Sequence, residues 1–174
     1  MDDATDDATD DATSDDDIDG APATITPKHD ALLLDVMLGK LATYLRVCGY
    51  DVLYALDEGL ERDDAVRERA VADGRRLITR DRDLSAATPG SFLLTARDVV
   101  DQLRELRVAG VELTPTDRPT RCGACNGRLE PAEDDSERPE YAPGTGRVWR
   151  CVDCGQYFWK GSHWDDLTEA IDRL

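Results

Sequence analysis

Apolar residues in the first two thirds of the chain fall into short runs separated by polar stretches. The run over residues 31–34 has no polar position and ends at Asp35, which is typical of a strand buried on both faces. Similar runs over 51–54, 76–79 and 91–94 predict three more strands. The pattern therefore predicts a sheet with a buried central strand.

Between these runs, apolar residues recur at the spacing of a helix. A stripe at positions i, i+3, i+4 and i+7 predicts a helix over residues 37–48. A second helix is expected from Asp63 to before Gly74, and another around 99–106 with Asp98 as its N-cap. Strands that alternate with helices in this way imply a parallel sheet with right-handed crossovers, so we expect an α/β fold.

The chain changes character after a Thr- and Pro-rich stretch. Four of its five cysteines form two Cys-x-x-Cys pairs, Cys122 with Cys125 and Cys151 with Cys154, separated by 25 residues. This arrangement suits tetrahedral zinc, and four protein ligands leave no position for an activated water. We therefore predict a structural zinc ribbon, with two disulfides or a redox dithiol as the alternative.

Two further features concern the remaining cysteine and the C-terminus. Cys48 lies beside the first helical stripe, and we expect it to be a buried, inert thiol. Residues 162–165 resemble a capping box and predict a final helix to about residue 173.

Negative charge is concentrated at the N-terminus. The net charge is −17, and the first twenty residues contain ten aspartates and no basic residue. A repeated Asp-Asp-Ala-Thr segment cannot bury enough apolar surface to offset the entropy of ordering. We therefore expect a disordered acidic tail over residues 1–28, an α/β domain over 29–116, and a zinc ribbon with a C-terminal helix over 117–174.

The composition also bears on compartment and partners. No apolar run approaches the roughly 20 residues of a membrane span, and the N-terminus lacks the regions of a signal peptide, so we expect a cytoplasmic protein. Scarce lysine with abundant arginine and aspartate resembles proteins of halophilic archaea, which live with molar cytoplasmic salt. At about 1 M salt the Debye length is only about 3 Å, so an acidic chain can still bind RNA.

Acidic residues follow the carboxyl ends of two predicted strands. Asp35 follows the first strand, and Asp81 and Asp83 follow the third. Because these ends share one edge of a parallel sheet, we expect the acids to converge there, with Asp63 on the same rim. Clustered carboxylates repel one another unless a divalent cation is bound, so this edge predicts a Mg²⁺ or Mn²⁺ site suited to phosphodiester hydrolysis.

Simpler roles remain open for each acid. Asp35 and Asp63 are also placed to cap helices, and one of Asp81 and Asp83 to form an Asx turn. The sequence contains no Gly-rich phosphate loop, no Gly-x-Ser-x-Gly and no His-Glu-x-x-His, which argues against P-loop, serine-nucleophile and zincin chemistry.

Several segments together resemble a known family. They are residues 34–42, 45–46, 49–51 and 77–84, Arg121 with the first cysteine pair and Asn126, and the second cysteine pair with 159–163. These segments are similar to the RNase family named after the C-terminal domain of the Mut-seven exonuclease. The resemblance implies a PIN-like nuclease fold with an appended zinc ribbon and a metal-dependent ribonuclease activity. It carries over Asp35, Asp81 and Asp83 as catalytic acids, and Asp63 at the second helix, with Asp64 as the alternative by one residue.

Basic and aromatic residues supply candidate RNA contacts. The candidates are Lys40, Arg46, Arg80 and Arg82 near the acids, and Arg150, Trp159 and His163 on the ribbon. Arginine and exposed aromatic rings suit single-stranded RNA, where stacking contributes about 1–3 kcal/mol per base. The alternatives are solvated ion pairs for the cations, a mini-core around the zinc for the aromatic rings, and helix-start packing for His163.

The leading hypothesis is a Mg²⁺- or Mn²⁺-dependent ribonuclease acting on single-stranded RNA, without membrane partners. Proteins of the RNA-processing or translation machinery are further candidate partners. The alternatives are a non-catalytic RNA-binding or protein-interaction module with a degenerate PIN-like domain, and a PIN-type toxin.

Overall fold

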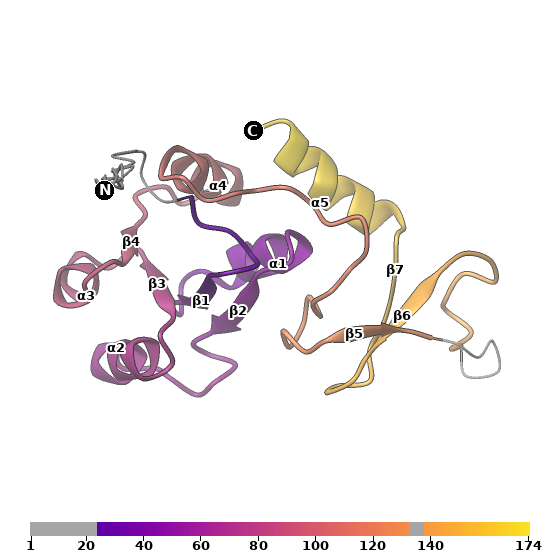
Figure 1. Cartoon of the computed structure of the whole chain (residues 1–174), viewed down its shortest axis with the longest axis horizontal. Helices are drawn as coiled ribbons and strands as arrows, with labels where there is room; N and C mark the ends of the chain where they lie inside the picture. Colours follow the sequence, from indigo (N-terminus) through magenta and orange to yellow (C-terminus); the bar gives the residue numbers. More distant parts are fainter. Residues whose placement is uncertain (1–23, 133–137) are drawn as a thin grey trace, which may run out of the picture.

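Four parallel strands form the central sheet of the computed structural model, which describes residues 24–132 and 138–174 (Figure 1). The strands are β1 (Ala31–Leu34), β2 (Asp51–Tyr54), β3 (Arg76–Thr79) and β4 (Phe92–Leu93), in the order β2-β1-β3-β4. The first three strands confirm the predictions, and the fourth is shorter than predicted.

Four helices accompany this sheet. They are α1 (Gly39–Val47), α2 (Asp63–Ala72), α3 (Arg82–Ala87) and α4 (Val99–Val108). The predicted N-cap of α4 is confirmed, because the Asp98 carboxylate accepts a hydrogen bond from the Val100 amide at 2.9 Å. Helix α3 was not delimited from sequence, since its six residues bury only Leu84 and show no apolar stripe.

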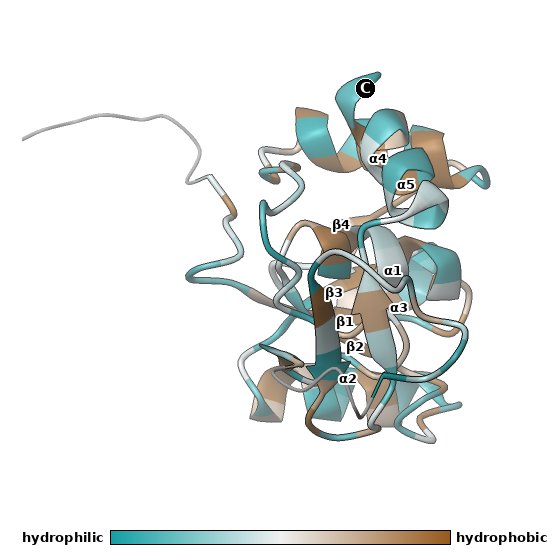
Figure 2. Ribbon diagram, turned by 90° about the vertical axis from the view of Figure 1, so that its right-hand side faces the viewer, coloured by the Kyte–Doolittle hydropathy of each residue, from teal (hydrophilic) through white to brown (hydrophobic). Residues whose placement is uncertain are grey.

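Helices cover both faces of the sheet. Because successive side chains of a strand point to opposite faces, Leu32 and Leu34 pack with α1 and α4, while Leu33 packs with α2 and α3. All three leucines are fully buried, which explains why this stretch of sequence has no polar position. Figure 2 shows the hydrophobic centre of the sheet between helices with hydrophilic turns.

The connections out of β1 and β3 diverge. From β1 the chain passes through α1 to β2, and it then crosses by α2 to β3 on the other side of β1. The two loops therefore lead to opposite faces of the sheet, and open α/β sheets generally bind their ligands beyond the carboxyl edge at such a point. Asp35 and Asp81 lie at the starts of these two loops.

The predicted acidic tail ends before residue 28. Ile25 is 6% exposed and forms a bridge with Val111, and its carbonyl accepts a hydrogen bond from the Tyr50 hydroxyl at 2.7 Å. Residues 24–28 thus belong to the α/β fold. Local composition does not predict this, because it depends on the pairing of Ile25 with Val111, which is distant in the sequence. The rest of the predicted tail, residues 1–23, lies outside the described residues.

The cysteine-bearing segment forms a second, antiparallel sheet. Its strands are β5 (Leu129–Pro131), β6 (Val148–Cys151) and β7 (Tyr157–Trp159), in that order. Helix α5 (Ser162–Asp172) follows and returns to the α/β core, where Leu167 and Ile171 join the cluster around α1 and α4 (Figure 1).

The predicted capping box of the final helix is wrong. Ser162 is already the first helical residue of α5, and the N-cap is Gly161, which has no side chain to accept a hydrogen bond. Packing of the apolar face of α5 against the core, rather than a polar cap, therefore positions this helix.

The ribbon covers the open edge of the main sheet through two polar side chains. Edge strand β2 leaves the N–H and C=O of Val52 without a neighbouring strand. Asn126 Oδ1 accepts from the Val52 amide at 2.8 Å, and Arg46 donates to the Val52 carbonyl at 3.1 and 2.9 Å. The same guanidinium donates to the carbonyls of Gly123 and Ala124 at 2.9 and 3.1 Å, so Arg46 joins the edge strand to the ribbon.

This placement corrects the predicted RNA contact of Arg46. The side chain is 4% exposed, and its donors point at backbone carbonyls of the protein. Burial lowers the pKa of Arg46, and the carboxylate of Asp57, 3.7 Å away, opposes that shift. A guanidinium enclosed in this way cannot reach a phosphate in solution.

Replacing Arg46 by methionine is expected to destabilise the protein by about 3 kcal/mol, because the carbonyls of Val52, Gly123 and Ala124 lose their donor while buried or partly buried. The control is Arg104→Met, which removes a half-exposed ion pair with Asp101 and should cost less than about 1 kcal/mol. Urea unfolding followed by tryptophan fluorescence measures both. Similar losses in the two variants would contradict the role of Arg46.

Candidate zinc centre and acidic rim

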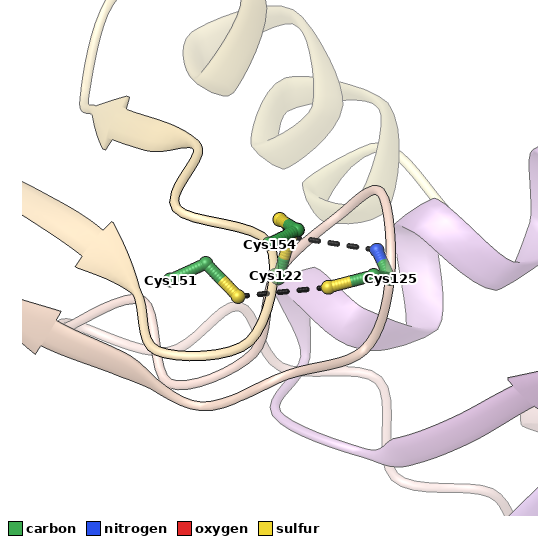
Figure 3. Close-up of side chains that lie close together, drawn as sticks. All are labelled: Cys122, Cys125, Cys151 and Cys154. Carbon is green, nitrogen blue, oxygen red and sulfur yellow. Dashed lines mark hydrogen bonds between the residues drawn. The ribbon is translucent and has the colours of Figure 1, made fainter.

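The four predicted cysteine ligands converge at one point between the ribbon turns (Figure 3). Their sulfur atoms all lie within 4.8 Å of one another, with Cys122 and Cys154 at 3.7 Å and Cys125 and Cys151 at 3.5 Å. In a tetrahedral zinc–thiolate site with bonds of about 2.3 Å, neighbouring sulfurs lie about 3.8 Å apart. All four cysteines are free thiols, so the geometry fits zinc and not the disulfide alternative.

Backbone amides of the ribbon turns face these sulfurs. The Cys125 amide donates to Cys122 Sγ at 3.4 Å. Burial raises the pKa of Cys122, which favours the neutral thiol in the metal-free site. For Cys151, burial also acts to raise the pKa, but hydrogen bonds with the amides of Cys154 and Asp153 and with neighbouring thiols together lower it. The turns therefore stabilise thiolate at one ligand, while at another a cation would have to offset the cost of burial.

Gly127 leaves room for one of the ligands. A Cβ atom at this position would lie 2.7 Å from Cys151 Sγ and 2.3 Å from a carboxylate oxygen of Asp153. Both contacts are closer than van der Waals packing allows, so only glycine fits beside the sulfur cluster. Gly127 follows the first cysteine pair in the sequence, but this steric role depends on Cys151 and Asp153, which lie far along the chain.

The fifth cysteine is separate from the site. Cys48 is 1% exposed within the main core, and burial raises its pKa to about 12. The thiol is therefore protonated at neutral pH, in agreement with the prediction that it is inert.

The carboxyl ends of β1 and β3 bring two of the predicted acids together. Asp35 is 3% exposed, and its Oδ2 accepts a hydrogen bond from Thr79 Oγ1 at 2.8 Å. The same hydroxyl oxygen accepts from the Asp81 amide at 2.9 Å. Thr79 was missed from sequence, although a polar residue closing a buried apolar strand directly before an acidic loop is a signal that could have identified it.

The capping alternatives resolve differently for each acid. Asp81 is the N-cap of α3, because its Oδ1 accepts from the Leu84 amide at 2.8 Å. Asp35 caps no helix, and Asp63 is the first residue of α2, whose start has no side-chain cap. Asp83 lies in the first turn of α3 and is exposed.

Electrostatics separate Asp63 from its neighbour Asp64. Slight burial and the negative charges of Asp81, Asp35, Asp64 and Asp83 raise the pKa of Asp63. The pKa of Asp64 is instead lowered, chiefly by its hydrogen bonds to Arg62. The two neighbouring acids of α2 therefore have opposite pKa shifts, and which of them belongs to the site stays a prediction.

None of the four acids has a basic partner in the described parts of the chain. Asp35, Asp63, Asp81 and Asp83 form no ion pair within residues 24–132 and 138–174, whereas Asp51 pairs with Arg75 at 2.7 Å. In the same ranges the only group of three or more potential metal ligands within 4.8 Å is the cysteine cluster. The acids therefore share a rim without forming a closed cage. Mg²⁺ fits such a donor set because it keeps several waters and binds through few carboxylates.

The predicted RNA contacts fall into two groups. Lys40 and Arg82 are exposed at the starts of α1 and α3, and Arg80 is half-buried between β3 and α3. On the ribbon, His163 is exposed, Trp159 is half-buried, and the guanidinium of Arg150 lies 5.6 Å from the centre of the Tyr157 ring. The placement of these six residues leaves their contact with RNA as a prediction.

The chain matches the model of a known protein family. The model of the family described as "Mut7-C RNAse domain" matches residues 30–171, which include both the acidic rim and the cysteine cluster. No curated protein and no solved structure matches the chain. Among the described residues, no helix is long and apolar enough to cross a membrane.

Gly127→Ala is expected to weaken zinc binding by at least about 10-fold, because the added methyl group occupies space beside Cys151 Sγ. Gly144→Ala is the matched control, since a Cβ atom there meets nothing within 4 Å. Zinc release to a chromogenic chelator, followed during thiol titration, measures the difference. Equal zinc retention in the two variants would show that the turn tolerates the methyl group.

Asp81→Asn is expected to lower the pKa of Asp63, because it removes the nearby charge that contributes most to the shift. Because the pKa of Asp63 is higher in the folded than in the unfolded protein, the folded state binds this proton more tightly. The free energy of unfolding therefore falls as pH rises through the pKa of Asp63. In Asp81→Asn, the free energy of unfolding should fall less than in the wild type over the same pH range. Carboxyl ¹³C NMR titration without divalent metal measures the pKa, with Asp101→Asn as the control; an unchanged value would place the two acids apart.

Proposed function

Because the chain belongs to the Mut7-C RNAse domain family, we propose that it is a Mg²⁺- or Mn²⁺-dependent ribonuclease that hydrolyses single-stranded RNA. Asp35, Asp63, Asp81 and Asp83 are the proposed catalytic acids. In this proposal, residues 29–116 form the PIN-like nuclease domain, and the zinc ribbon over 117–174 supports it and helps to bind RNA.

The observation that carries the proposal is the set of carboxylates at the edge of the sheet where the loops after β1 and β3 diverge, none of which has an ion pair within the described residues. Elsewhere in the described chain, acids such as Asp51, Asp73 and Asp101 lie within 4.0 Å of arginine. At the rim, by contrast, neighbouring negative charges raise the pKa of Asp63. Such mutual repulsion costs stability unless a cation or a cationic partner offsets it.

The side chains have distinct parts in the proposed reaction. Thr79 holds Asp35 in one orientation with a 2.8 Å hydrogen bond, so this buried carboxylate has little freedom to turn. Asp81 is held by its cap of α3, while exposed Asp63 and Asp83 can approach a metal from the rim. When bound, Mg²⁺ or Mn²⁺ supplies an activated water and stabilises the leaving oxygen.

The cysteine site has a structural part in this proposal. Four converging sulfurs would fill the tetrahedral positions of zinc and leave none for water. Zinc would fix the turn that contains Asn126. The Asn126 side chain accepts a hydrogen bond from the Val52 amide and donates one to the Asp51 carboxylate, each at 2.8 Å. Loss of zinc should therefore destabilise the edge of the main sheet.

One observation favours the non-catalytic alternative. The Asp81 carboxylate caps α3, and the acids do not form a compact ligand group within the described residues. A binding module would retain RNA without cleaving it and would not take up Mn²⁺ at the rim.

The double variant Asp35→Asn with Asp81→Asn is expected to reduce RNA cleavage at least about 100-fold, the scale on which single catalytic groups act. Asparagine keeps the size of each side chain and can still accept a hydrogen bond, so the fold should persist. Asp101→Asn, at an exposed ion pair on α4, is the control and should cleave normally.

The assay uses zinc-loaded protein, single-stranded RNA and Mn²⁺, with Mn²⁺ binding measured independently by electron paramagnetic resonance. Wild-type protein should bind Mn²⁺ more tightly than the double variant. If the wild type binds RNA but neither cleaves it nor binds Mn²⁺, the result would support the non-catalytic binding module and contradict the nuclease proposal. Equal cleavage by the double variant would assign the activity to a contaminant.

A further inference from the structure

A hollow of about 470 Å³ lies where the ribbon, α1 and α5 meet. Thr43 and Val47 of α1 form one wall, Leu167 of α5 forms another, and the strand β7 with the turn after it forms the third. The volume is in the range of about 300–1,000 Å³ that is typical of small-ligand sites. No segment of the described chain fills it.

Aromatic rings dominate the ribbon side of this hollow. Tyr157, Phe158, Trp159 and Trp164 all line it, and each is partly exposed. Trp149, by contrast, is 6% exposed. The rings that line the hollow therefore keep surface that a ligand can reach. A fully packed aromatic core around the zinc would leave no such surface.

The charge of the lining is unusual for this chain. The sequence contains 38 Asp and Glu among 174 residues, yet none of the residues lining the hollow is acidic. Arg121 and His163 line it, although Arg121 is partly neutralised by Asp51 at 3.4 Å. The ammonium group of Lys160 lies 5.4 Å from the centre of the ring of Trp164, which lines the hollow. The local charge thus suits an anionic ligand with flat rings.

A second hollow of about 470 Å³ adjoins the first and shares Trp159 and Gly161 with it. Arg147, Lys160 and Trp149 also line this second hollow, together with one acidic residue, Asp117. Tyr141, which is 68% exposed, lies with its ring centre 6.1 Å from that of Trp159. Two adjoining hollows with Trp159 between them suit consecutive units of a chain molecule better than a single small ligand.

We propose that the hollow between α1, the ribbon and α5 binds an unpaired base of single-stranded RNA, with Lys160 contacting a phosphate beside it. The proposal rests on the proposed function, because it names the feature of the RNA substrate that the ribbon recognises. Paired bases stay stacked within a duplex and cannot enter, whereas an unpaired base can stack on the rings. An apolar peptide would fill the same walls without needing the cations or the absence of acids.

The test uses full-length, zinc-loaded protein without added divalent metal, so that binding is measured apart from cleavage. Quenching of the three tryptophans reports titrations with a single-stranded RNA, the same RNA in a duplex, and an abasic strand of equal length and charge. Single-stranded RNA is expected to bind at least about 10-fold more tightly than either other probe, the scale of one stacked base.

Phe158→Leu keeps an apolar side chain in the hollow and removes the aromatic ring. It should weaken binding of single-stranded RNA about 10-fold and leave the abasic strand unaffected. Phe92→Leu is the matched control, because the chain has two phenylalanines and Phe92 is also half-buried, on β4. Thr43→Phe, which narrows the hollow from α1, is a second variant; zinc content and melting temperature verify that each variant is folded.

The outcomes separate this inference from the nuclease proposal. Base-dependent binding that Phe158→Leu weakens supports the inference even if the wild type never cleaves RNA. Equal affinity for abasic and intact strands overturns it even if cleavage occurs. Unchanged RNA affinity in both Phe158→Leu and Thr43→Phe also overturns the inference. That result would favour an apolar segment of a partner protein as the ligand of the hollow.

Discussion

The hydrogen bonds that Arg46 and Asn126 make to Val52 hold the two sheets together. An edge strand normally exposes backbone groups that can pair with another chain. Here one buried guanidinium serves both the edge strand and the ribbon turn, while the Asn126 amide completes the contact from the ribbon side. Asn126 has a φ of 68°, the only left-handed backbone conformation of a non-glycine residue in the described chain. The turn that would enclose zinc and the edge of the main sheet are therefore parts of one polar joint.

This joint explains why the ribbon behaves as part of the fold and not as an attached module. Helix α5, which follows the ribbon, packs Leu167 and Ile171 into the core beside α1 and α4. The ribbon is thus fixed at both ends, by polar contacts at β2 and by apolar burial at α5. The hollow beside Thr43 and Val47 lies between these two attachments, and the aromatic rings of β7 line it opposite α1.

Charge is distributed in opposite ways at the two candidate sites. At the rim, four carboxylates lie near one another without an ion pair in the described residues, and the pKa of Asp63 rises in response. In the hollow, acidic residues are absent from the lining although they are common in the chain. A divalent cation at the first site and an RNA strand at the second are complementary to these charges, and a metal-dependent nuclease would need both partners.

The sequence by itself determined the strands β1, β2 and β3, the α/β alternation and the cysteine ligand set, because apolar periodicity and ligand spacing are properties of the chain alone. It also located Asp35, Asp63 and Asp81 at strand ends and helix starts. Only the tertiary structure decided that Arg46 joins two sheets, that Ile25 belongs to the core, that Thr79 orients Asp35, and that the pKa of Asp63 is raised while that of Asp64 is lowered. Each of these depends on a partner far away in sequence or on the direction of a side chain, and neither is encoded by local pattern.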